Sequence, residues 1–212
     1  MSMKKALVCI VCMIMFVSLT SCRSYYEKEE IGAALAELIP ASMPLNEIYF
    51  GEGLPFADEE ERIKKFFDTF ELGETASNYY PVSESCGYEN IEEIKEATRA
   101  VYSEDYCEYL FTMAFSGISD VFNEGTEEEV KQTAVFARYI EQSGILTRRV
   151  LEEDDIIELN RTYDVSDFTV IINREEFVTA EVQSYVNGKK DTLIEIKLVL
   201  TPNGWRLDSP TY

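Results

Sequence analysis

Two tight turns near the C-terminal end of the chain limit its fold more than any other feature. Asn187-Gly188 separates a run of strand-forming residues, Phe177–Val186, from a second run, Thr192–Leu200. Asn and Gly tolerate the positive φ angles that a two-residue hairpin turn requires. Thr201-Pro202-Asn203-Gly204 turns the chain again before the short run Trp205–Ser209, because Pro fixes φ and the residues after it accept the left-handed region. The C-terminal part of the chain therefore predicts three antiparallel strands.

Further strands are predicted upstream of these turns. Tyr79–Val82 has the composition of a short edge strand, where a proline is tolerated. Ala134–Ile140 and Gly144–Leu151 predict a hairpin around Gln142-Ser143-Gly144. The strongest alternating pattern belongs to the C-terminal segment, where it predicts a core-facing stripe made of Ile194, Ile196, Leu198 and Leu200.

The N-terminal half of the chain shows helical spacing instead. Glu27–Ile39 is predicted to be a helix that Pro40 and Pro44 interrupt or kink. Asn90 and Ser103 are predicted N-caps of two further helices, because each side chain can accept a hydrogen bond from the first turn. Helices followed by an antiparallel meander predict an α+β fold, in which N-terminal helices pack on one highly curved sheet.

The first residues of the chain have the pattern of an export signal. Lys4 and Lys5 form a positive segment, and the apolar run Ala6–Val17 is too short to favour a permanent membrane span. The next residues resemble the lipobox of bacterial lipoproteins, with an aliphatic residue, two small residues and a cysteine: Leu19, Thr20, Ser21 and Cys22. This resemblance implies cleavage before Cys22 and diacylation of its thiol, which is enough for stable membrane anchoring.

The domain organisation follows from these patterns. We expect a lipoprotein signal peptide over residues 1–21, a polar tether over 22–30, an N-terminal helical segment over 31–78 and an α+β domain over 79–212. The lipid on Cys22 would hold the mature chain on the extracytoplasmic face of the cell membrane.

The charge balance argues against nucleic acids as partners. The chain carries 40 acidic and 19 basic residues and a net charge of −21. A charge of this sign repels phosphate backbones, so nucleic-acid binding is disfavoured. A solvated acidic surface also suits a soluble extracellular domain.

Two cysteines remain for the folded part of an exported chain. Of the five cysteines, Cys9 and Cys12 lie in the leader and Cys22 is the lipidation site. Cys86 and Cys107 would lie outside the cytoplasm, where a disulfide between them could persist. The alternative is two separate thiols, with Cys107 buried as a small hydrophobic residue.

The sequence offers no recognisable catalytic set. The chain contains no histidine, which removes the commonest general base at neutral pH and the Ser-His-Asp and Cys-His arrangements. The acidic runs 58–61 and 152–155 lack the spaced ligands and central glycine of a calcium loop. We therefore predict a protein that is not an enzyme and has neither a cofactor nor a metal site.

Aromatic residues suggest where a ligand could bind. Trp205 is the only tryptophan and begins the last predicted strand. A cavity between helices and sheet would be lined by Trp205, Tyr106, Leu110 and Met113. The alternative for Trp205 is packing in the core or at an edge, and Arg206 and Asp208 on the opposite face are then expected to have surface or loop-pinning roles.

The order of elements over Ile91–Tyr212 resembles the cystatin-like and NTF2-like superfamilies, in which N-terminal helices pack into the concave side of a bent sheet. A more distant likeness, to secreted cystatin-like inhibitors of cell-wall DL-endopeptidases, depends on the predicted helix pair Ile91–Phe115 and the meander. It implies restraint of a cell-wall hydrolase, although no inhibitory motif matches residue by residue.

Two strings resemble signatures of uncharacterised lipoproteins from clostridial-type Gram-positive bacteria. They are Leu45–Pro55 and Thr201–Tyr212, and they bracket most of the mature chain. That family supplies no activity to carry over.

Three hypotheses about function follow. The first is a non-catalytic, membrane-anchored lipoprotein that binds an envelope protein or a wall component. The second is a small-molecule-binding protein with a cavity between helices and sheet. The third is an enzyme that uses Asp and Glu alone, and the sequence gives it the least support. The partner and the oligomeric state are not determined by the sequence.

Overall fold

A computed structural model describes residues 25–61, 78–116, 118–121 and 132–212, and it has the predicted α+β fold. The described helices comprise the α-helices α2, α4 and α5, two short 3-10 helices, η1 and η3, and a π-helical turn, η2. Their bounds are α2 Lys28–Tyr49, η1 Glu84–Cys86, α4 Ile91–Arg99, α5 Glu104–Phe111, η2 Thr112–Ser116 and η3 Glu153–Asp155. The strands are β1 Tyr79–Pro81, β2 Ile118–Val121, β3 Gln132–Val135, β4 Tyr139–Gln142, β5 Ile145–Arg149, β6 Arg161–Asn173, β7 Phe177–Val186, β8 Lys189–Thr201 and β9 Gly204–Leu207.

The C-terminal meander is an antiparallel sheet in the order β6-β7-β8-β9. Asn187 (φ 51°) and Gly188 (φ 71°) form the predicted hairpin turn between β7 and β8, and Gly204 (φ 99°) ends the second turn. Irregularities of register in β6, between Asp164 and Phe168 and between Val170 and Ile172, bend this strand. The two predicted turns are thus confirmed. Each could be predicted because it depends on residues that are next to each other in the sequence.

One residue of the predicted core stripe is not in the core. Ile196 and Leu198 are fully buried and Ile194 is partly buried, but Leu200 is 45 % exposed. Leu200 pairs with Trp205 close to the turn between β8 and β9. The buried stripe therefore ends before this turn.

Helix α2 is continuous through Pro40 and Pro44, so the prolines do not interrupt it; the alternative of a kink there stays a prediction. Both prolines and Ala36, whose carbonyl loses its usual partner at Pro40, lie on the exposed face. Water can satisfy carbonyls there, which lowers the penalty of a proline inside a helix. The opposite face is buried along the whole length, in a series that continues past both prolines: Ile31, Ala34, Leu35, Leu38, Ile39, Ser42, Leu45, Asn46, Ile48 and Tyr49.

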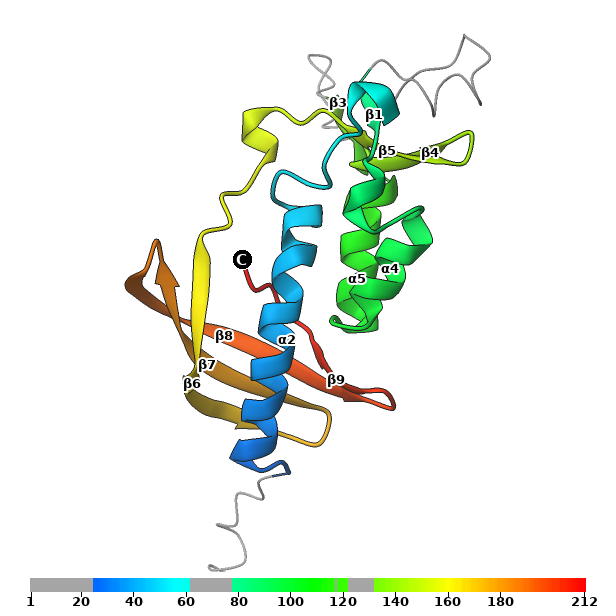
Figure 1. The fold of residues 1–212 in the computed structure, drawn as a ribbon. Helices are drawn as coiled ribbons and strands as arrows, with labels where there is room; N and C mark the ends of the chain where they lie inside the picture. The colour runs from blue at the N-terminus through cyan, green and yellow to red at the C-terminus, as the bar shows by residue number, and fades with distance from the viewer. Residues whose placement is uncertain (1–24, 62–77, 117, 122–131) are drawn as a thin grey trace, which may run out of the picture.

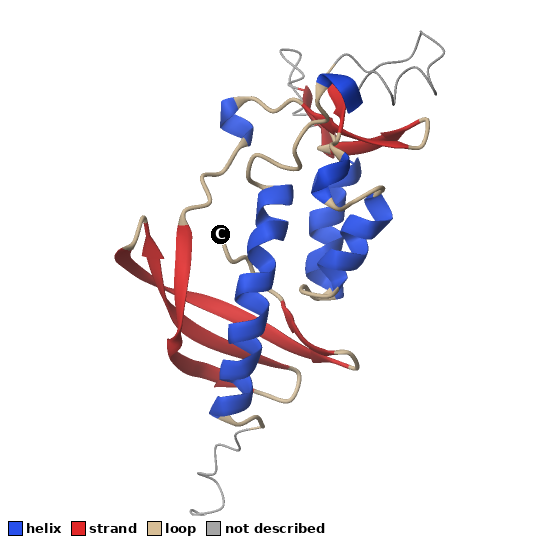
Figure 2. Cartoon of the chain, in the orientation of Figure 1, coloured by secondary structure: helices blue, strands red, loops and turns tan. Residues whose placement is uncertain are grey.

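Figure 1 shows α2 crossing the four-stranded sheet, with α4 and α5 beside α2 on the side of β9. The predicted caps of α4 and α5 are confirmed: Asn90 accepts a hydrogen bond from the backbone N–H of Glu93, and Ser103 accepts one from Tyr106. Figure 2 shows that the strands fall into separate groups around these helices.

The prediction of a single curved sheet is therefore wrong, because the described strands form three separate sheets. The predicted edge strand, β1, joins the hairpin of β4 and β5 in a three-stranded sheet with the order β1-β5-β4, and β2 pairs with β3 alone. The expected strand Ala134–Ile140 is divided between β3 and β4. Local patterns predicted the hairpin turn between β4 and β5, but the extent of a strand and its membership of a sheet depend on contacts between distant residues.

One hydrophobic core joins these parts. It includes residues from α2, α4, α5, the small sheet and the meander; its largest fully buried side chains include Tyr102, Tyr139, Ile31, Leu35, Ile94, Leu110, Ile196, Leu198 and Leu207. Core residues thus come from both sides of the predicted boundary at residue 78, and that boundary stays a prediction.

Candidate functional site

Three arginines gather on the β4–β5 hairpin, next to the C-terminal end of α2. The turn Ser143-Gly144 places Arg148 opposite Tyr139, and the backbone N–H of Arg149 donates to the carbonyl of Arg138 at 2.9 Å. Because side chains alternate along a strand, Arg138 and Arg149 share one face of the hairpin, and Arg148 and Tyr139 share the other.

Arg138 and Arg148 donate hydrogen bonds to backbone carbonyls of the last residue of α2 and of the loop that follows it. Arg138 donates through Nη1 to the carbonyl of Tyr49 at 2.9 Å and through Nη2 to that of Gly51, while Arg148 donates to the carbonyl of Glu52. Helix α2 has no basic residue in its own last turn, so these arginines supply the positive charge that favours a helix C-terminus. Burial lowers the pKa of both guanidinium groups, although arginine stays charged in proteins.

A cavity of about 310 Å³ opens beside this hairpin, and we call it the arginine pocket. It combines apolar and aromatic side chains with two arginines and two aspartates. Its lining residues are Tyr49, Phe50, Tyr109, Leu110, Met113, Ala114, Phe136, Arg138, Arg149, Leu151, Asp154, Asp155, Ile157 and Tyr212. A pocket of this size and composition can hold a small molecule or the end of a polymer chain.

The structure brings together only part of the predicted pocket. Leu110 and Met113 line the arginine pocket. Tyr106 lies beside it, with its ring centroid 6.0 Å from that of Tyr109, a lining residue.

Trp205 lies elsewhere, near the N-terminal end of α2. Its indole Nε1 donates to Glu30 at 3.1 Å, and its ring packs edge-on against Tyr26 at 4.7 Å. Trp205 therefore has the packing role that was the alternative to a pocket wall. Its neighbour Asp208 accepts hydrogen bonds from Ser103 and from Lys197, which is the predicted loop-pinning role.

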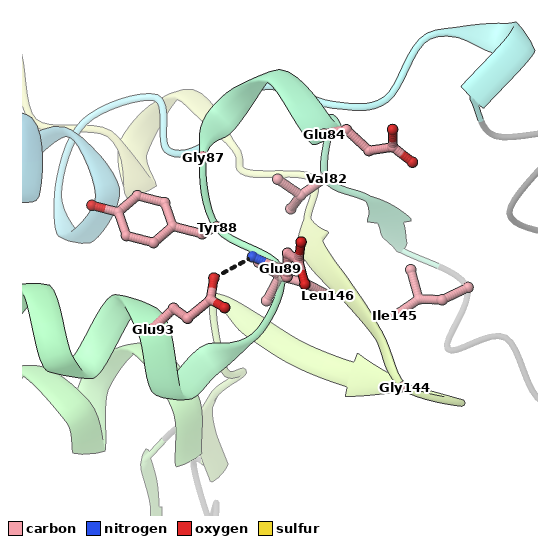
Figure 3. Close-up of a pocket in the computed structure, with 9 residues that line it drawn as sticks. All are labelled: Val82, Glu84, Gly87, Tyr88, Glu89, Glu93, Gly144, Ile145 and Leu146. Atoms are coloured by element: carbon pink, nitrogen blue, oxygen red, sulfur yellow. Dashed lines mark hydrogen bonds between the residues drawn. The ribbon is translucent and has the colours of Figure 1, made fainter.

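A second, wider hollow of about 660 Å³ lies between η1, the start of α4 and the β4–β5 turn. Figure 3 shows its carboxylates, and one of them, Glu93, accepts a hydrogen bond from the backbone N–H of Glu89 at 2.7 Å. Glu84 and Glu89 also line it, and its described lining residues include no cationic side chain. Among the described residues no group of His, Cys, Asp and Glu has the arrangement of a metal site.

Cys86 and Cys107 are free thiols in the structure, which is the second of the two predicted alternatives. Cys107 is fully buried on α5, and burial raises the pKa of its thiol to about 12. Cys86 is partly exposed after η1.

We expect the two thiols to differ strongly in reactivity, because the thiolate is the nucleophile and Cys107 is both protonated and buried. In the folded protein at pH 8, iodoacetamide should alkylate Cys86 at least about tenfold faster than Cys107, as measured by peptide mass spectrometry. Both should react after unfolding in urea. Equal rates in the folded protein, or protection of both thiols until a reductant is added, would contradict the structure.

The lipobox residues Leu19, Thr20, Ser21 and Cys22 lie outside the described residues, so lipidation at Cys22 stays a prediction. None of the described helices combines the length and the apolar character that a membrane crossing requires.

Sequence reasoning missed Arg138, Arg149 and Phe136. A usable signal was present only in part. The turn was predicted over Gln142-Ser143-Gly144, whereas the structure has a two-residue turn, Ser143-Gly144, and residues at equal distances before and after that turn form cross-strand pairs. That count sets Arg138 against Arg149. Nothing local indicates that the end of α2 lies next to them.

The comparisons with known proteins add no family to this description: no family model, no curated protein and no solved structure matches the chain.

Proposed function

We propose that this chain is a non-catalytic lipoprotein, anchored to the extracytoplasmic face of the membrane through lipid on Cys22, which binds an envelope protein or a wall component. The observation that carries the binding role is the set of exposed apolar side chains around the arginine pocket. Phe136 is 62 %, Tyr109 49 % and Ile157 45 % exposed, and all three line the pocket. Exposed apolar residues that are gathered in one place, rather than scattered, mark interaction sites.

The finer fold assignment, cystatin-like or NTF2-like, is part of this proposal. It is supported by the antiparallel meander β6-β7-β8-β9 with a helix against it. The helix in that position is α2 rather than the expected pair α4 and α5. Restraint of a cell-wall hydrolase depends on the distant likeness alone, and we keep it as one form that partner binding could take.

Small-molecule binding is the second candidate. It is favoured by the volume of the arginine pocket, about 310 Å³, which lies at the lower end of the range of ligand sites.

Substitution of the lipidation site tests the anchor. We expect the wild-type chain, expressed in a bacterium that processes lipoproteins, to carry a diacylglyceryl mass increment and to sediment with membranes. The Cys22→Ala variant should lose both properties, because a chain without acyl groups lacks the apolar contact with the bilayer. Intact mass and membrane partition are the measurements, and a soluble, unmodified wild-type product would overturn the anchored location.

The partner half of the proposal is tested with one variant in the rim of the arginine pocket and one control variant outside it. Cross-linking on intact membranes should yield a product with the wild-type chain that is lost in Phe136→Ala and kept in Leu193→Ala. Leu193 is a suitable control because it is also an exposed large apolar residue but lies on β8, away from the pocket lining. Cross-linked products that are the same in all three chains would contradict binding at this rim.

A further inference from the structure

Two positive charges lie next to each other in the lining of the arginine pocket. Arg138 and Arg149 are cross-strand neighbours, and both line the pocket. Like charges directly opposite each other on a sheet are destabilising. The pair therefore creates a local demand for negative charge, in a chain whose net charge is −21.

Hydrogen-bonding capacity remains in both guanidinium groups. Arg138 is only 8 % exposed, and its two hydrogen bonds run from Nη1 and Nη2 to carbonyls at the end of α2. Within the described part of the chain, the buried Nε atoms of Arg138 and Arg149 have no hydrogen-bond partner, and neither has that of Arg148, which lies outside the pocket lining. A buried, charged donor without a partner is unfavourable, and an anionic oxygen is its best acceptor.

The protein supplies part of the required negative charge. Asp155 accepts from Nη2 of Arg149 at 2.9 Å, and this carboxylate is well exposed. Asp154 also lines the pocket and is exposed. Neither is a hydrogen-bond acceptor for Arg138, whose bonds within the described residues run to the carbonyls of Tyr49 and Gly51.

The apolar part of the pocket indicates what accompanies the anion. Tyr109, Met113 and Phe136 belong to α5, η2 and the segment before β4, and the ring centroids of Phe50 and Tyr212 lie 4.1 Å apart with the rings tilted by 34°. Such side chains favour an apolar or aromatic group of a ligand.

We propose that the arginine pocket binds a carboxylate carried on an apolar or aromatic group, about the size of one amino-acid residue. The carboxylate lies against Arg149 and Arg138, whose planar guanidinium groups suit the two oxygens of a carboxylate. The apolar group packs between Tyr109, Met113 and Phe136. This inference names the ligand chemistry of the proposed binding role and rests on it; a free acid and the C-terminal end of a peptide both present this chemistry.

Calorimetry on the full chain tests the inference with two matched probes, N-acetylphenylalanine and its amide. They have the same ring and differ in the carboxylate alone. We expect the acid to bind about tenfold or more tightly than the amide, the difference expected for one charged hydrogen bond. Equal affinities, or no binding of either probe, would overturn the proposal. A tripeptide that ends in phenylalanine is the third probe: tighter binding than the acid assigns the site to chain ends, and weaker binding assigns it to free acids.

Two variants separate recognition of the carboxylate from a merely structural role. Arg149→Gln and Asp155→Asn both break the same ion pair. Arg149→Gln should weaken binding of the acid about tenfold because it removes a cation. Asp155→Asn should strengthen binding because it removes a competing carboxylate. If the ion pair serves the fold only, both variants should change the affinity in the same direction, and that result would contradict the inference.

The result is independent of the other tests. Membrane anchoring is measured through Cys22, and partner capture is measured through Phe136. If capture depends on Phe136 but the acid does not bind, the proposed function stands and the carboxylate is wrong. If capture fails and Cys22→Ala changes nothing, the proposed function itself fails.

Discussion

Replacement of Gly53 by alanine is expected to lower the free energy of unfolding by about 3 kcal/mol or more. Gly53 adopts a φ of +81°, where a residue with a Cβ is strained. A Cβ at this position would also lie 2.7 Å from the hydroxyl of Tyr139 and 2.9 Å from Nη1 of Arg148. Neither group can move freely, because Tyr139 binds the backbone at Ile48 and Leu54 and Arg148 binds it at Glu52. Urea unfolding, followed by circular dichroism, measures the loss.

Gly144→Ala is the matched control. Gly144 has nearly the same φ, +77°, but an added Cβ would meet nothing within 4 Å. Gly144→Ala should lose stability through backbone strain alone, about 1 kcal/mol. The difference in unfolding free energy between the two variants therefore measures the clash with Tyr139 and Arg148. Equal losses in the two variants would show that the loop after α2 is not held against the hairpin.

The parts of the fold that depend on neighbouring residues could be predicted from the sequence. The turn at Asn187-Gly188 and the caps at Asn90 and Ser103 are confirmed because each requires a particular side chain within a few residues. The effect of Pro40 could not be predicted, because it depends on which face of α2 points to water. That face is decided by the sheet, whose residues lie far away in the sequence.

The candidate site was harder to predict for the same reason. Leu110 and Met113, which were grouped because they share one helical face, both line the arginine pocket. Trp205 was placed with them on the assumption that helix α5 covers the meander, and in the structure α2 occupies that position beside β9. The arginine pocket forms where the end of α2, the β4–β5 hairpin and Tyr212 lie side by side. These segments are far apart in the sequence, so no local pattern predicts that they are in contact.

The buried arginines connect stability with the proposed binding role. Arg138 uses two donors on the end of α2 and still lines the pocket. Its position is therefore fixed by the helix rather than by a ligand, and the cation is already placed when a ligand arrives. A binding group held in this way loses little conformational entropy on binding.

The C-terminus completes the pocket, and a buried polar network holds it there. Asn46 on α2 donates through Nδ2 to the hydroxyl of Thr211 at 2.9 Å and accepts a hydrogen bond from the hydroxyl of Tyr102 at 2.8 Å. Ser42 shares a hydrogen bond with the same Thr211 hydroxyl at 2.7 Å. Asn46 and Thr211 are almost completely buried, and the next residue, Tyr212, lines the pocket.

Asn46→Ala is expected to destabilise the protein by about 3 kcal/mol, because it leaves buried polar partners unsatisfied and opens a small cavity. Urea unfolding of the purified protein measures this loss. The adjacent variant Glu47→Ala is the control: Glu47 is exposed, so its loss should stay within about 0.5 kcal/mol.

A double-mutant cycle then locates the effect. Thr211→Val removes the hydroxyl that joins Asn46 to Ser42, so the losses in Asn46→Ala and Thr211→Val should add to more than the loss in the double variant, by about 1 kcal/mol. Additive losses would mean that Asn46 stabilises α2 without holding the C-terminus. Coupled losses would mean that Tyr212 is held in the pocket wall by this network, and Thr211→Val should then also weaken the binding of N-acetylphenylalanine although it changes no pocket-lining residue.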